Sequence, residues 1–427
     1  MLQVSDIRDK RETFVNGLIK RGLNDAAQLL DHVVELDDQR KRLQTERDHI
    51  QAEANLIAKS IGMLMKSGDK DGAEVAKQKA AELKNRSGQL SKEFTEVSER
   101  VTKALYNIPN IPNELVPSGS TDDDNQVIKT IDELPKIVDG AKPHWDLIVD
   151  YDIIDFELGN KITGAGFPIY KGKGAKLQRA LINFFLDEAE LAGYREIQPP
   201  VVINETSGYG TGQLPDKEGQ MYQLTNSDLY LIPTAEVPIT NMYRDVILKE
   251  EELPVKNVGY TPCFRREAGS WGAHVRGLNR LHQFDKVEIV QIQKPENSYA
   301  ALDEMMEHVE GLLVKLELPY RILRLCGGDL GFTSAITYDF EVYSAAQKRW
   351  LEVSSVSNFE TYQANRLKLR YKSKDKKNLT LHTLNGSALA LPRILAAILE
   401  NNQSEGEIKI PDVLKPYTRF DRIELIN

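Results

Sequence analysis

Cysteine is scarce in this chain, and the familiar spacings of metal ligands are missing. The 427 residues contain two cysteines, Cys263 and Cys326, and neither belongs to a Cys-x-x-Cys pair; the pattern His-Glu-x-x-His is also absent. These absences exclude a disulfide framework and a zinc site with a recognisable ligand spacing. We expect both thiols to be chemically inert.

Long apolar runs are missing as well. The longest such stretch, 388–399, is interrupted by Pro392 and Arg393, and it is shorter than the roughly 20 residues that a membrane-spanning helix needs. The first eleven residues are charged from Asp6 onward and lack the apolar centre of a secretion signal. The sequence therefore predicts a cytoplasmic protein without a membrane span.

The chain has no excess of positive charge. Lysine and arginine number 55 against 64 aspartates and glutamates, which gives a formal net charge of −9. This balance excludes a protein that binds polyanions through a general basic surface. Hydrophobic residues make up 41% and charged residues 28%, as in a soluble globular protein with a sizeable core. At about 150 residues per domain, the length allows two or three domains.

The glycine-rich motifs of common nucleotide-binding folds are incomplete. Gly164-Ala165-Gly166 and Gly172-Lys173-Gly174 lack the third glycine of a dinucleotide fingerprint and the Gly-Lys-Ser/Thr ending of a P-loop. The segment 268–272 has alanine where the nucleophile elbow of a serine hydrolase requires glycine. These three chemistries are therefore disfavoured.

A seven-residue repeat is the clearest positive signal in the first quarter of the chain. Its main positions are Leu29, Leu36, Leu43, Ile50, Ile57 and Leu64, with Val33, Arg40, Arg47, Ala54 and Ile61 interleaved. After a break at 67–72, a second series steps by three and four: Ala73, Ala76, Ala80, Leu83, Ser87, Leu90, Phe94, Val97, Val101 and Ala104. The pattern predicts two antiparallel helices in a coiled-coil hairpin, an arm of about 55 to 60 Å.

The charges of this arm allow more than one interpretation. Between His32 and Leu105 there are 14 basic and 13 acidic residues, as on a solvated coiled-coil surface. Arg40 and Arg47 occupy seam positions where apolar side chains are preferred. They either reach a groove and bind phosphate or extend along the seam with the charged end in water.

The remainder of the chain predicts an α+β domain. Residues 107–125 are rich in proline and acidic residues and predict a linker. Beyond it, Leu177 to Leu191 has one apolar helical face, and 194–203 is expected to be extended around Pro199-Pro200. Further strands are predicted at 229–232, 257–265, 286–293, 338–343 and 350–354. Because several strands follow one another without crossover helices, we expect a mainly antiparallel sheet flanked by helices. The predicted domains are 1–106, with the arm at about 27–105, and 126–427.

Arginines cluster at 260–290, where the pattern is strand, glycine-containing loop, strand. Arg265 and Arg266 precede the loop, and Arg276 and Arg280 follow it. Guanidinium groups match phosphate oxygens and stay charged at any working pH, and an aromatic side chain such as Phe284 offers a face to a purine. Taken alone, the same segment is also compatible with a surface hairpin that carries scattered arginines.

Four separated segments, in order, resemble seryl-tRNA synthetase of the bacterial type, a class II aminoacyl-tRNA synthetase, and the resemblance covers essentially the whole chain. They are Gly193-Tyr194 with Pro199-Pro200 and 210–215, similar to motif 1; Thr234-Ala235-Glu236, similar to the serine-binding loop; 264–288, similar to motif 2; and 352–358 with Asn385-Gly386-Ser387 and Arg393, similar to motif 3. The long helical arm before the catalytic domain points to serine among the class II enzymes.

The resemblance implies a role for each matching residue. Arg265, Arg280 and Arg393 would be catalytic, the first on the α-phosphate of ATP and the others on the outer phosphates. The implied ATP site also includes Arg266, Glu267 facing the adenine amino group, Phe284 stacking on the ring, Glu352, Val353, Ser354 and Ser355. Glu352 and Ser355 would bind Mg²⁺. The implied serine pocket consists of Thr234, Ala235, Glu236, Arg265, Glu288, Asn385 and Ser387.

Three positions depart from the family pattern. Arg266 stands where a small residue is more common, His274-Val275 replaces an acidic start, and Leu391-Pro392 precedes Arg393 in place of Val-Gly. Proline removes a backbone donor and fixes φ, which predicts an altered entry into the last long helix. None of these changes removes a functional group named above.

The resemblance implies that the protein activates L-serine with ATP and Mg²⁺ and then transfers serine to tRNA(Ser), and to tRNA(Sec) where present. The arm would grip the long variable arm of the tRNA, and the enzyme would be a homodimer. Two alternatives remain open: a related synthetase that loads a carrier protein, which the long arm disfavours, and a non-catalytic coiled-coil scaffold or RNA-binding regulator, which intact Arg265, Glu288, Glu352 and Arg393 disfavour.

Overall fold

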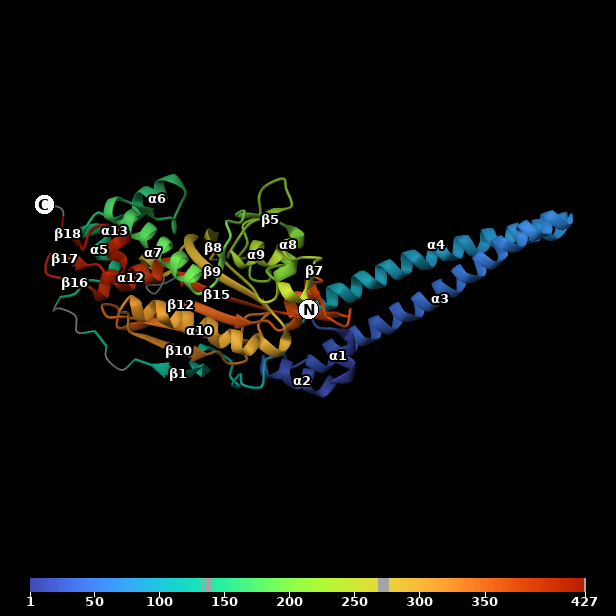
Figure 1. The fold of residues 1–427 in the computed structure, drawn as a ribbon, viewed down its shortest axis with the longest axis horizontal. Coiled ribbons are helices and arrows are strands. Elements are labelled where there is room, and N and C mark those ends of the chain that lie inside the picture. Colours follow the sequence, from blue (N-terminus) through green and yellow to red (C-terminus); the bar gives the residue numbers. More distant parts are fainter. Residues whose placement is uncertain (132–133, 136–139, 268–275, 426–427) are drawn as a thin grey trace. The chain divides into compact units, whose positions relative to one another are not determined.

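The chain divides into two compact units. The computed structural model describes residues 1–131, 134–135, 140–267 and 276–425. The smaller unit comprises residues 1–19 and 23–109, and the larger unit comprises 20–22 and 110–427 (Figure 1). Across the described ranges, each helix is either too short or too polar to traverse a lipid bilayer.

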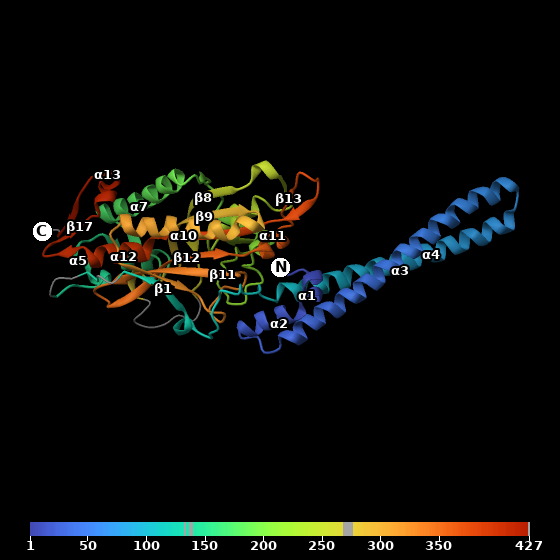
Figure 2. The same ribbon diagram turned by 60° about the horizontal axis from the view of Figure 1, so that its bottom comes forward.

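The smaller unit is entirely helical. Its elements are α1 (Val4–Asp9), α2 (Arg11–Lys20), α3 (Ala26–Ser67) and α4 (Lys70–Tyr106). Helices α3 and α4 have 42 and 37 residues, which correspond to lengths of about 63 and 55 Å. They pack against each other as the long hairpin that Figures 1 and 2 show. The predicted antiparallel arm is confirmed.

The seam of the hairpin follows the predicted spacing. Every position of both predicted series is buried or half-buried, and Val33, Leu36, Ala73 and Leu90 are the most enclosed. Several apolar side chains outside the two series, such as Met63, are exposed. The heptad pattern therefore marked the contact surface and not merely the presence of a helix.

The two seam arginines contact side chains of the arm itself. A guanidinium nitrogen of Arg40 donates to Asp37 Oδ1 at 2.7 Å, and the guanidinium carbon of Arg47 lies 4.6 Å from the centre of the Phe94 ring. Both side chains are about 30% exposed (28% and 31%). The aliphatic stems of both arginines thus cover the seam while their charged ends stay near water. This arrangement corresponds to the second interpretation, in which the arginines extend along the seam.

The turn between α3 and α4 is shorter than the predicted break. Gly68 ends α3 in the left-handed conformation, with φ of 82°, and its N–H donates to carbonyls of the last turn. Asp69 caps α4, because its side chain accepts from the N–H of Gly72 at 2.9 Å. Glycine at this position and aspartate at the next are the residues that such ends favour, so the second helix starts at Lys70 and includes Gly72.

An eight-stranded sheet forms the centre of the larger unit. All its neighbours are antiparallel except β4 and β8, so the predicted mainly antiparallel sheet is confirmed. In spatial order its strands are β1 (Gln126–Thr130), β10 (Tyr320–Arg324), β11 (Ile336–Ser344), β12 (Arg349–Asn358), β15 (His382–Ala390), β9 (Gln283–Gln293), β8 (Val255–Phe264) and β4 (Arg195–Glu196).

Helices α7 (Gly172–Leu191), α10 (Ser298–Lys315) and α12 (Leu391–Asn401) cover one face of the central strands (Figure 2). Side chains alternate between the two faces of a strand. On β9, Val287 and Ile289 enter the core beneath these helices, whereas Phe284, Lys286 and Glu288 face a cavity. The alternation on one strand thus separates the hydrophobic core from the candidate site.

Shorter elements surround the sheet. The helices are α5 (His144–Asp150), α6 (Phe156–Ile162), α8 (Glu205–Thr211), α9 (Glu236–Asn241), α11 (Thr361–Arg366) and α13 (Lys415–Thr418). Three small ladders pair β2 (Ile154–Asp155) with β3 (Ile169–Tyr170), β5 (Val202–Asn204) with β6 (Leu229–Leu231), and β7 (Ile247–Lys249) with β13 (Arg370–Lys372) and β14 (Asn378–Thr380). A fourth joins β16 (Gln403–Ser404), β17 (Glu407–Lys409) and β18 (Arg422–Glu424).

Two segments around the sheet differ from the predicted structure, which was an extended segment at 194–203 and a linker at 107–125. In 194–203 the strands β4 and β5 flank Pro199-Pro200, where proline cannot donate to a ladder. The predicted linker 107–125 contains one 3₁₀ turn, Asp122–Asp124. From Asn110 onward it belongs to the larger unit, where Val116 is 1% exposed.

Candidate active site

A cavity of about 700 Å³ opens on the face of the sheet that α7, α10 and α12 do not cover. Its walls come from the end of β8, from β9, β12 and β15, from the first turns of α9 and α12, and from the loop 212–221. The cavity gathers residues from all the segments that carried the resemblance. Of the sequence-predicted site residues, it is lined by Thr234, Glu236, Arg265, Glu267, Arg280, Phe284, Glu288, Glu352, Val353, Ser354, Ser355, Asn385, Ser387 and Arg393.

Glu288 is the centre of a polar cluster at the floor of the cavity. Its side chain is fully buried. Lys286 Nζ lies 2.6 Å from Glu288 Oε2, Asn385 Nδ2 donates to Oε1 at 2.9 Å, and Ser387 Oγ donates to Oε2 at 3.4 Å. A carboxylate accepts about four hydrogen bonds, so one acceptor position remains for a ligand.

A second buried carboxylate, Glu236, lies near this cluster. It begins α9, and Gln363 Nε2 donates to its Oε1 at 2.7 Å. Burial and the negative charge of Glu288 raise the pKa of Glu236 to about 7, although the bond from Gln363 and the nearby cations Lys286 and Arg265 act in the opposite direction. A cationic ligand would therefore meet a group that is half ionised near neutral pH.

Arg265 follows the last residue of β8 and projects into the cavity. Its backbone N–H donates to the carbonyl of His282 at 2.9 Å, and its Nε donates to the carbonyl of Pro233 at 3.4 Å. The guanidinium carbon is 5.2 Å from the centre of the Phe284 ring. A cation and an aromatic face, held by two neighbouring strands, suit a phosphate and a nucleobase.

Glu267 has an unusual backbone conformation that bonds to Gln220 accompany. Its φ is +49°, in the left-handed region that non-glycine residues rarely adopt. The side chain of Gln220 accepts from the backbone N–H of Glu267 at 3.0 Å, and the Gln220 carbonyl accepts from that of Arg266 at 2.9 Å. The carboxylate of Glu267 forms an ion pair with Arg280 across the cavity mouth.

The opposite wall carries oxygen ligands beside a third arginine. Ser355 Oγ donates to Glu352 Oε1 at 3.4 Å. Arg393, in the first turn of α12, donates through Nη1 to the carbonyl of Glu352 at 2.7 Å and through Nε to the carbonyl of Asn279 at 3.1 Å. Within the described ranges, no cluster of three or more His, Cys, Asp or Glu side chains is arranged to hold a metal ion.

Some of the sequence predictions are not met at the cavity. Arg266 is exposed and Ala235 is buried in a small apolar cluster, and neither lines the cavity. The expected departure at His274-Val275 and the segment 268–272 lie outside the described residues. Pro392 lies in the first turn of α12, where a backbone donor has no partner within the helix, so proline is compatible with a regular entry.

Sequence reasoning missed Lys286, Gln363 and the part of the loop that follows residue 215. Lys286 was detectable, because it lies between Phe284 and Glu288 at the two-residue spacing that places all three on one strand face. Gln363 and Gln220 gave no comparable signal, since each is recognised only by the bond that it makes across the fold. Both cysteines are buried and form no disulfide.

The comparisons with known proteins cover both units. Residues 1–112 match the family "Seryl-tRNA synthetase N-terminal domain", and residues 221–402 match "tRNA synthetase class II core domain (G, H, P, S and T)". The serine–tRNA ligase of Salinibacter ruber is 48% identical over 99% of both chains. That of Alkaliphilus oremlandii is 47% identical over 98% of both.

Solved structures agree with these relatives. A seryl-tRNA synthetase from Pyrococcus horikoshii complexed with ATP superposes with a TM-score of 0.92 at 34% identity, over all of both chains. A cytoplasmic serine–tRNA ligase from Naegleria fowleri in complex with AMP gives a TM-score of 0.86 at 25% identity, over 100% of this chain and 99% of that one.

Proposed function

Because the chain belongs to the seryl-tRNA synthetase family, we propose that its cavity performs the two steps of a serine–tRNA ligase. Serine and ATP first form seryl adenylate and pyrophosphate, and the seryl group then passes to the 3′ end of tRNA(Ser). The convergence of Lys286, Asn385 and Ser387 on buried Glu288, next to Arg265, carries this proposal. This convergence supports a small polar pocket beside an arginine that would bind phosphate.

ATP would lie across the arginine-lined part of the cavity. Phe284 stacks on the adenine ring, and Glu267 accepts a hydrogen bond from its amino group. Arg265 holds the α-phosphate, and Arg280 and Arg393 hold the outer phosphates. The Gln220 contacts support this arrangement, because they fix the Glu267 backbone in the conformation that aims its side chain into the cavity.

Mg²⁺ would bind at Glu352 and Ser355. Their oxygen atoms belong to the hard ligands that Mg²⁺ prefers, and this ion is usually held by one or two protein ligands together with substrate phosphates. A pair of protein oxygens therefore fits the ion. When bound, Mg²⁺ supplies charge neutralisation at the phosphate oxygens.

Serine would occupy the deep end of the cavity. Glu236 pairs with its ammonium group, and Glu288 accepts a hydrogen bond from its hydroxyl group. Three protein donors already contact Glu288. Alanine, which has no hydroxyl group, would therefore leave only one acceptor position of the carboxylate empty. The preference for serine over alanine is then smaller than it would be with an otherwise unpaired carboxylate. Threonine would be refused by lack of room.

The first step needs positioning more than acid or base chemistry. A carboxylate oxygen of serine attacks the α-phosphorus, the bond from that phosphorus to the bridging oxygen breaks, and pyrophosphate leaves. Arg265 stabilises the charge that grows on the α-phosphoryl oxygens, and Arg280 and Arg393 hold the leaving pyrophosphate. In the second step, a terminal ribose hydroxyl of the tRNA attacks the carbonyl carbon and AMP leaves.

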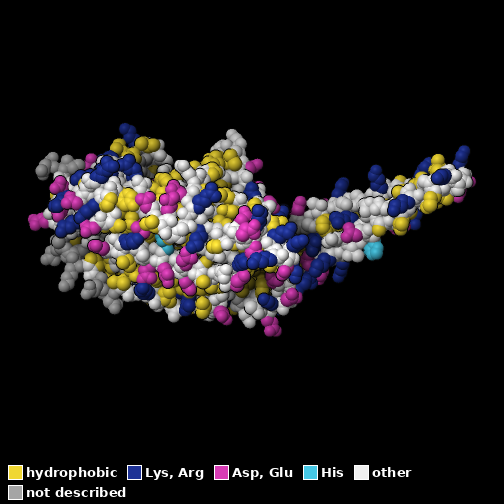
Figure 3. Space-filling model, in the orientation of Figure 1, with side chains coloured by type: hydrophobic (Ala, Val, Ile, Leu, Met, Phe, Trp, Pro, Cys, Tyr) yellow, Lys and Arg dark blue, Asp and Glu magenta, His cyan; other side chains and the backbone are white. Residues whose placement is uncertain are grey.

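The arm would bind the tRNA. On the face that Figure 3 shows, lysine and arginine side chains recur along α3 and α4, although the arm as a whole is nearly neutral. Recognition of RNA shape by a few placed cations fits this surface, and we expect moderate salt dependence. A two-fold homodimer, in which one subunit's arm reaches RNA at the other active site, accords with the symmetry common among oligomers.

The deciding experiment is ATP–pyrophosphate exchange with each of the twenty amino acids. We expect exchange with serine, and then charging of tRNA(Ser) but not of a carrier protein. Exchange with no amino acid would favour the non-catalytic scaffold. Serine-dependent exchange with transfer to a carrier protein would favour the related synthetase.

Glu288→Ala is expected to lower kcat/KM for serine in the exchange assay by about 100-fold, because the substrate hydroxyl loses its acceptor and Lys286 is left buried without its partner. The KM for ATP should stay near the wild-type value. Unchanged kinetic constants for serine would remove Glu288 from the pocket.

The pH dependence of serine binding tests Glu236. The pKa of Glu236 is raised to about 7, and only the ionised form attracts the substrate ammonium group. We therefore expect kcat/KM for serine in the exchange assay to rise with pH through about 7 and then level off. Glu236→Gln should remove this inflection and lower the plateau. An inflection that persists in the variant would assign it to another group.

A further inference from the structure

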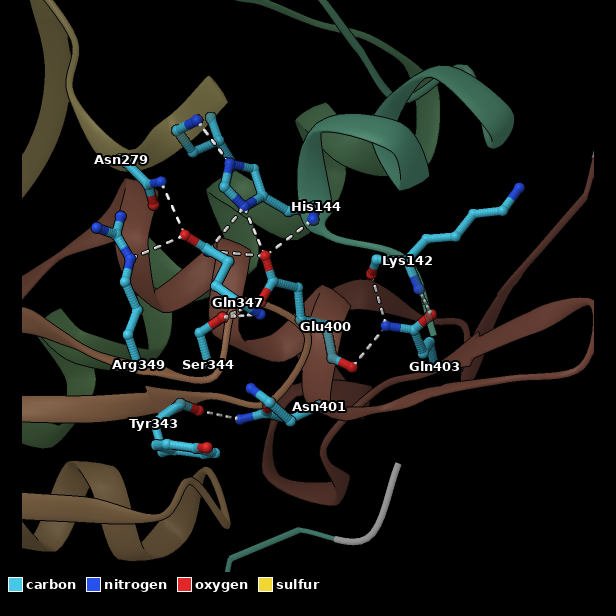
Figure 4. A network of polar contacts seen from close by, with 12 residues as sticks. Lys142, His144, Asn279, Tyr343, Ser344, Gln347, Arg349, Glu400, Asn401 and Gln403 are labelled. Atoms are coloured by element: carbon cyan, nitrogen blue, oxygen red, sulfur yellow. Dashed lines mark hydrogen bonds and ion pairs between the residues drawn. The ribbon is translucent and has the colours of Figure 1, made fainter. Parts of the chain in front are cut away.

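Behind the phosphate-binding wall, two fully buried side chains form a hydrogen-bonded network (Figure 4). His144 begins α5, Glu400 lies near the end of α12, and the side chains of both are 0% exposed. Glu400 Oε1 accepts from the backbone N–H of His144 at 2.9 Å and lies 2.7 Å from His144 Nδ1. Neither residue lines the cavity.

The contacts define which nitrogen of His144 carries a proton. The backbone N–H of Leu278 donates to Nε2 at 2.8 Å, so Nε2 is the acceptor and Nδ1–H donates to Glu400. Burial tends to raise the pKa of Glu400, but hydrogen bonds from His144 and Ser344 outweigh it and lower that pKa. The imidazole is thus an oriented bridge between an ionised carboxylate and one backbone N–H.

The segment that receives this bridge is the 3₁₀ turn Gly277–Asn279, which directly precedes Arg280. Gly277 has a φ of +66°, and a Cβ atom there would lie 2.4 Å from His144 Nε2. Only glycine allows this conformation and this close approach. The turn therefore rests directly on the edge of the imidazole ring.

The same turn also contacts the second outer-phosphate arginine. The carbonyl of Asn279 accepts from Arg393 Nε at 3.1 Å. Arg393 and Glu400 are seven residues apart on α12, two turns along one helix face. Glu400 contacts the turn through His144 while Arg393 contacts it directly, so the turn is attached to α12 at two points.

A parallel connection passes through Gln347. Its Nε2 donates to Glu400 Oε1 at 2.9 Å, and its Oε1 accepts from Asn279 Nδ2 at 3.0 Å. Glu400 therefore fixes both the backbone and the side chains of the turn.

We propose that His144 and Glu400 are positioning residues that hold the turn 277–279 so that Arg280 and Arg393 meet the outer phosphates of ATP. This inference rests on the proposed function, which assigns those phosphates to the two arginines. The inference predicts that only the binding of the outer phosphates is affected. Loss of the bridge weakens contacts to the outer phosphates and leaves the contacts to adenine and the α-phosphate, made by Phe284, Glu267 and Arg265, in place.

The test compares the affinities of ATP and AMP, because AMP lacks the outer phosphates. Calorimetric titration of the full-length protein with Mg²⁺ and ATP, without serine, should give a Kd about tenfold higher for Glu400→Ala than for wild type, a cost of about 1.4 kcal/mol. The Kd for AMP should change by less than about twofold. Glu400→Gln keeps an acceptor oxygen for His144 and should restore most of the ATP affinity.

Two further variants make the result decisive. His382→Ala removes another buried histidine, which does not line the cavity and whose Nδ1 lies 2.7 Å from Ser298 Oγ. In this variant the ratio of ATP to AMP affinity should be unchanged. Gln347→Ala, at a half-buried position, interrupts the parallel connection. It should raise the Kd for ATP by about threefold and leave the Kd for AMP unchanged. It replaces Glu400→Ala if that variant does not fold.

A wild-type ATP-to-AMP affinity ratio in Glu400→Ala, or in Gln347→Ala where the first is unstable, would overturn the positioning role. Failure of the wild-type protein to exchange pyrophosphate with serine would instead overturn the proposed function. The two failures are therefore distinguishable.

Discussion

Arg265→Ala is expected to lower kcat/KM for serine-dependent pyrophosphate exchange by about 1,000-fold, a loss of about 4 kcal/mol of transition-state stabilisation. In the proposed reaction, the guanidinium would face the charge that grows on the α-phosphoryl oxygens as the serine carboxylate attacks. It is held at the end of β8 by the carbonyl of Pro233 and lies against Phe284, so it needs little rearrangement to act. Steady-state exchange kinetics with ATP and serine varied separately provide the measurement.

Arg265→Lys separates charge from geometry. Lysine keeps the positive charge but lacks the planar guanidinium that binds two oxygens at once. We therefore expect kcat/KM of this variant to be about 100-fold below that of the wild type. Arg422→Ala is the matched control: it removes a guanidinium from a surface ion pair with Glu407, and activity should change by less than about twofold. Near wild-type exchange in Arg265→Ala would refute the assignment to the α-phosphate.

The arm was the most predictable part of the fold because its pattern is local. Seven-residue periodicity determines which side chains of each helix meet, and Gly68 with Asp69 encodes the turn. The strands with alternating side chains were also located to within a few residues. β1 was missed because all five of its residues are exposed, so no alternation marks it. β10 and β15 were not predicted as strands either; β15 is buried over most of its length and shows no alternation.

The candidate site was predictable where the resemblance supplied roles for separate segments. Composition and spacing alone indicated only arginines and an aromatic residue around a loop. The carboxylate cluster at Glu288 required the pairing of β9 with β15, which places Ser387 opposite Glu288. His144 and Glu400 were beyond reach, since they lie 256 residues apart and the bridge to Leu278 depends on the packing of three elements.

Deleting residues 31–102 is expected to lower serylation of tRNA(Ser) by about 1,000-fold, equivalent to about 4 kcal/mol of lost binding, while serine-dependent pyrophosphate exchange stays near the wild-type rate. The cut removes most of α3 and α4, whose seam residues pack on each other. Every residue that lines the cavity lies between 212 and 393. The remaining helix ends would be joined by a short Gly-Ser turn.

The contrast between the two reactions is the internal control of this deletion. A folded cavity that makes adenylate but does not charge tRNA assigns the arm to RNA binding. A tRNA that lacks its long variable arm should be a poor substrate for the full-length enzyme and the truncated enzyme alike, since neither can form the contact. Charging of intact tRNA(Ser) by the truncated enzyme at the wild-type rate would show that the arm serves another purpose, because recognition would then reside entirely in the larger unit.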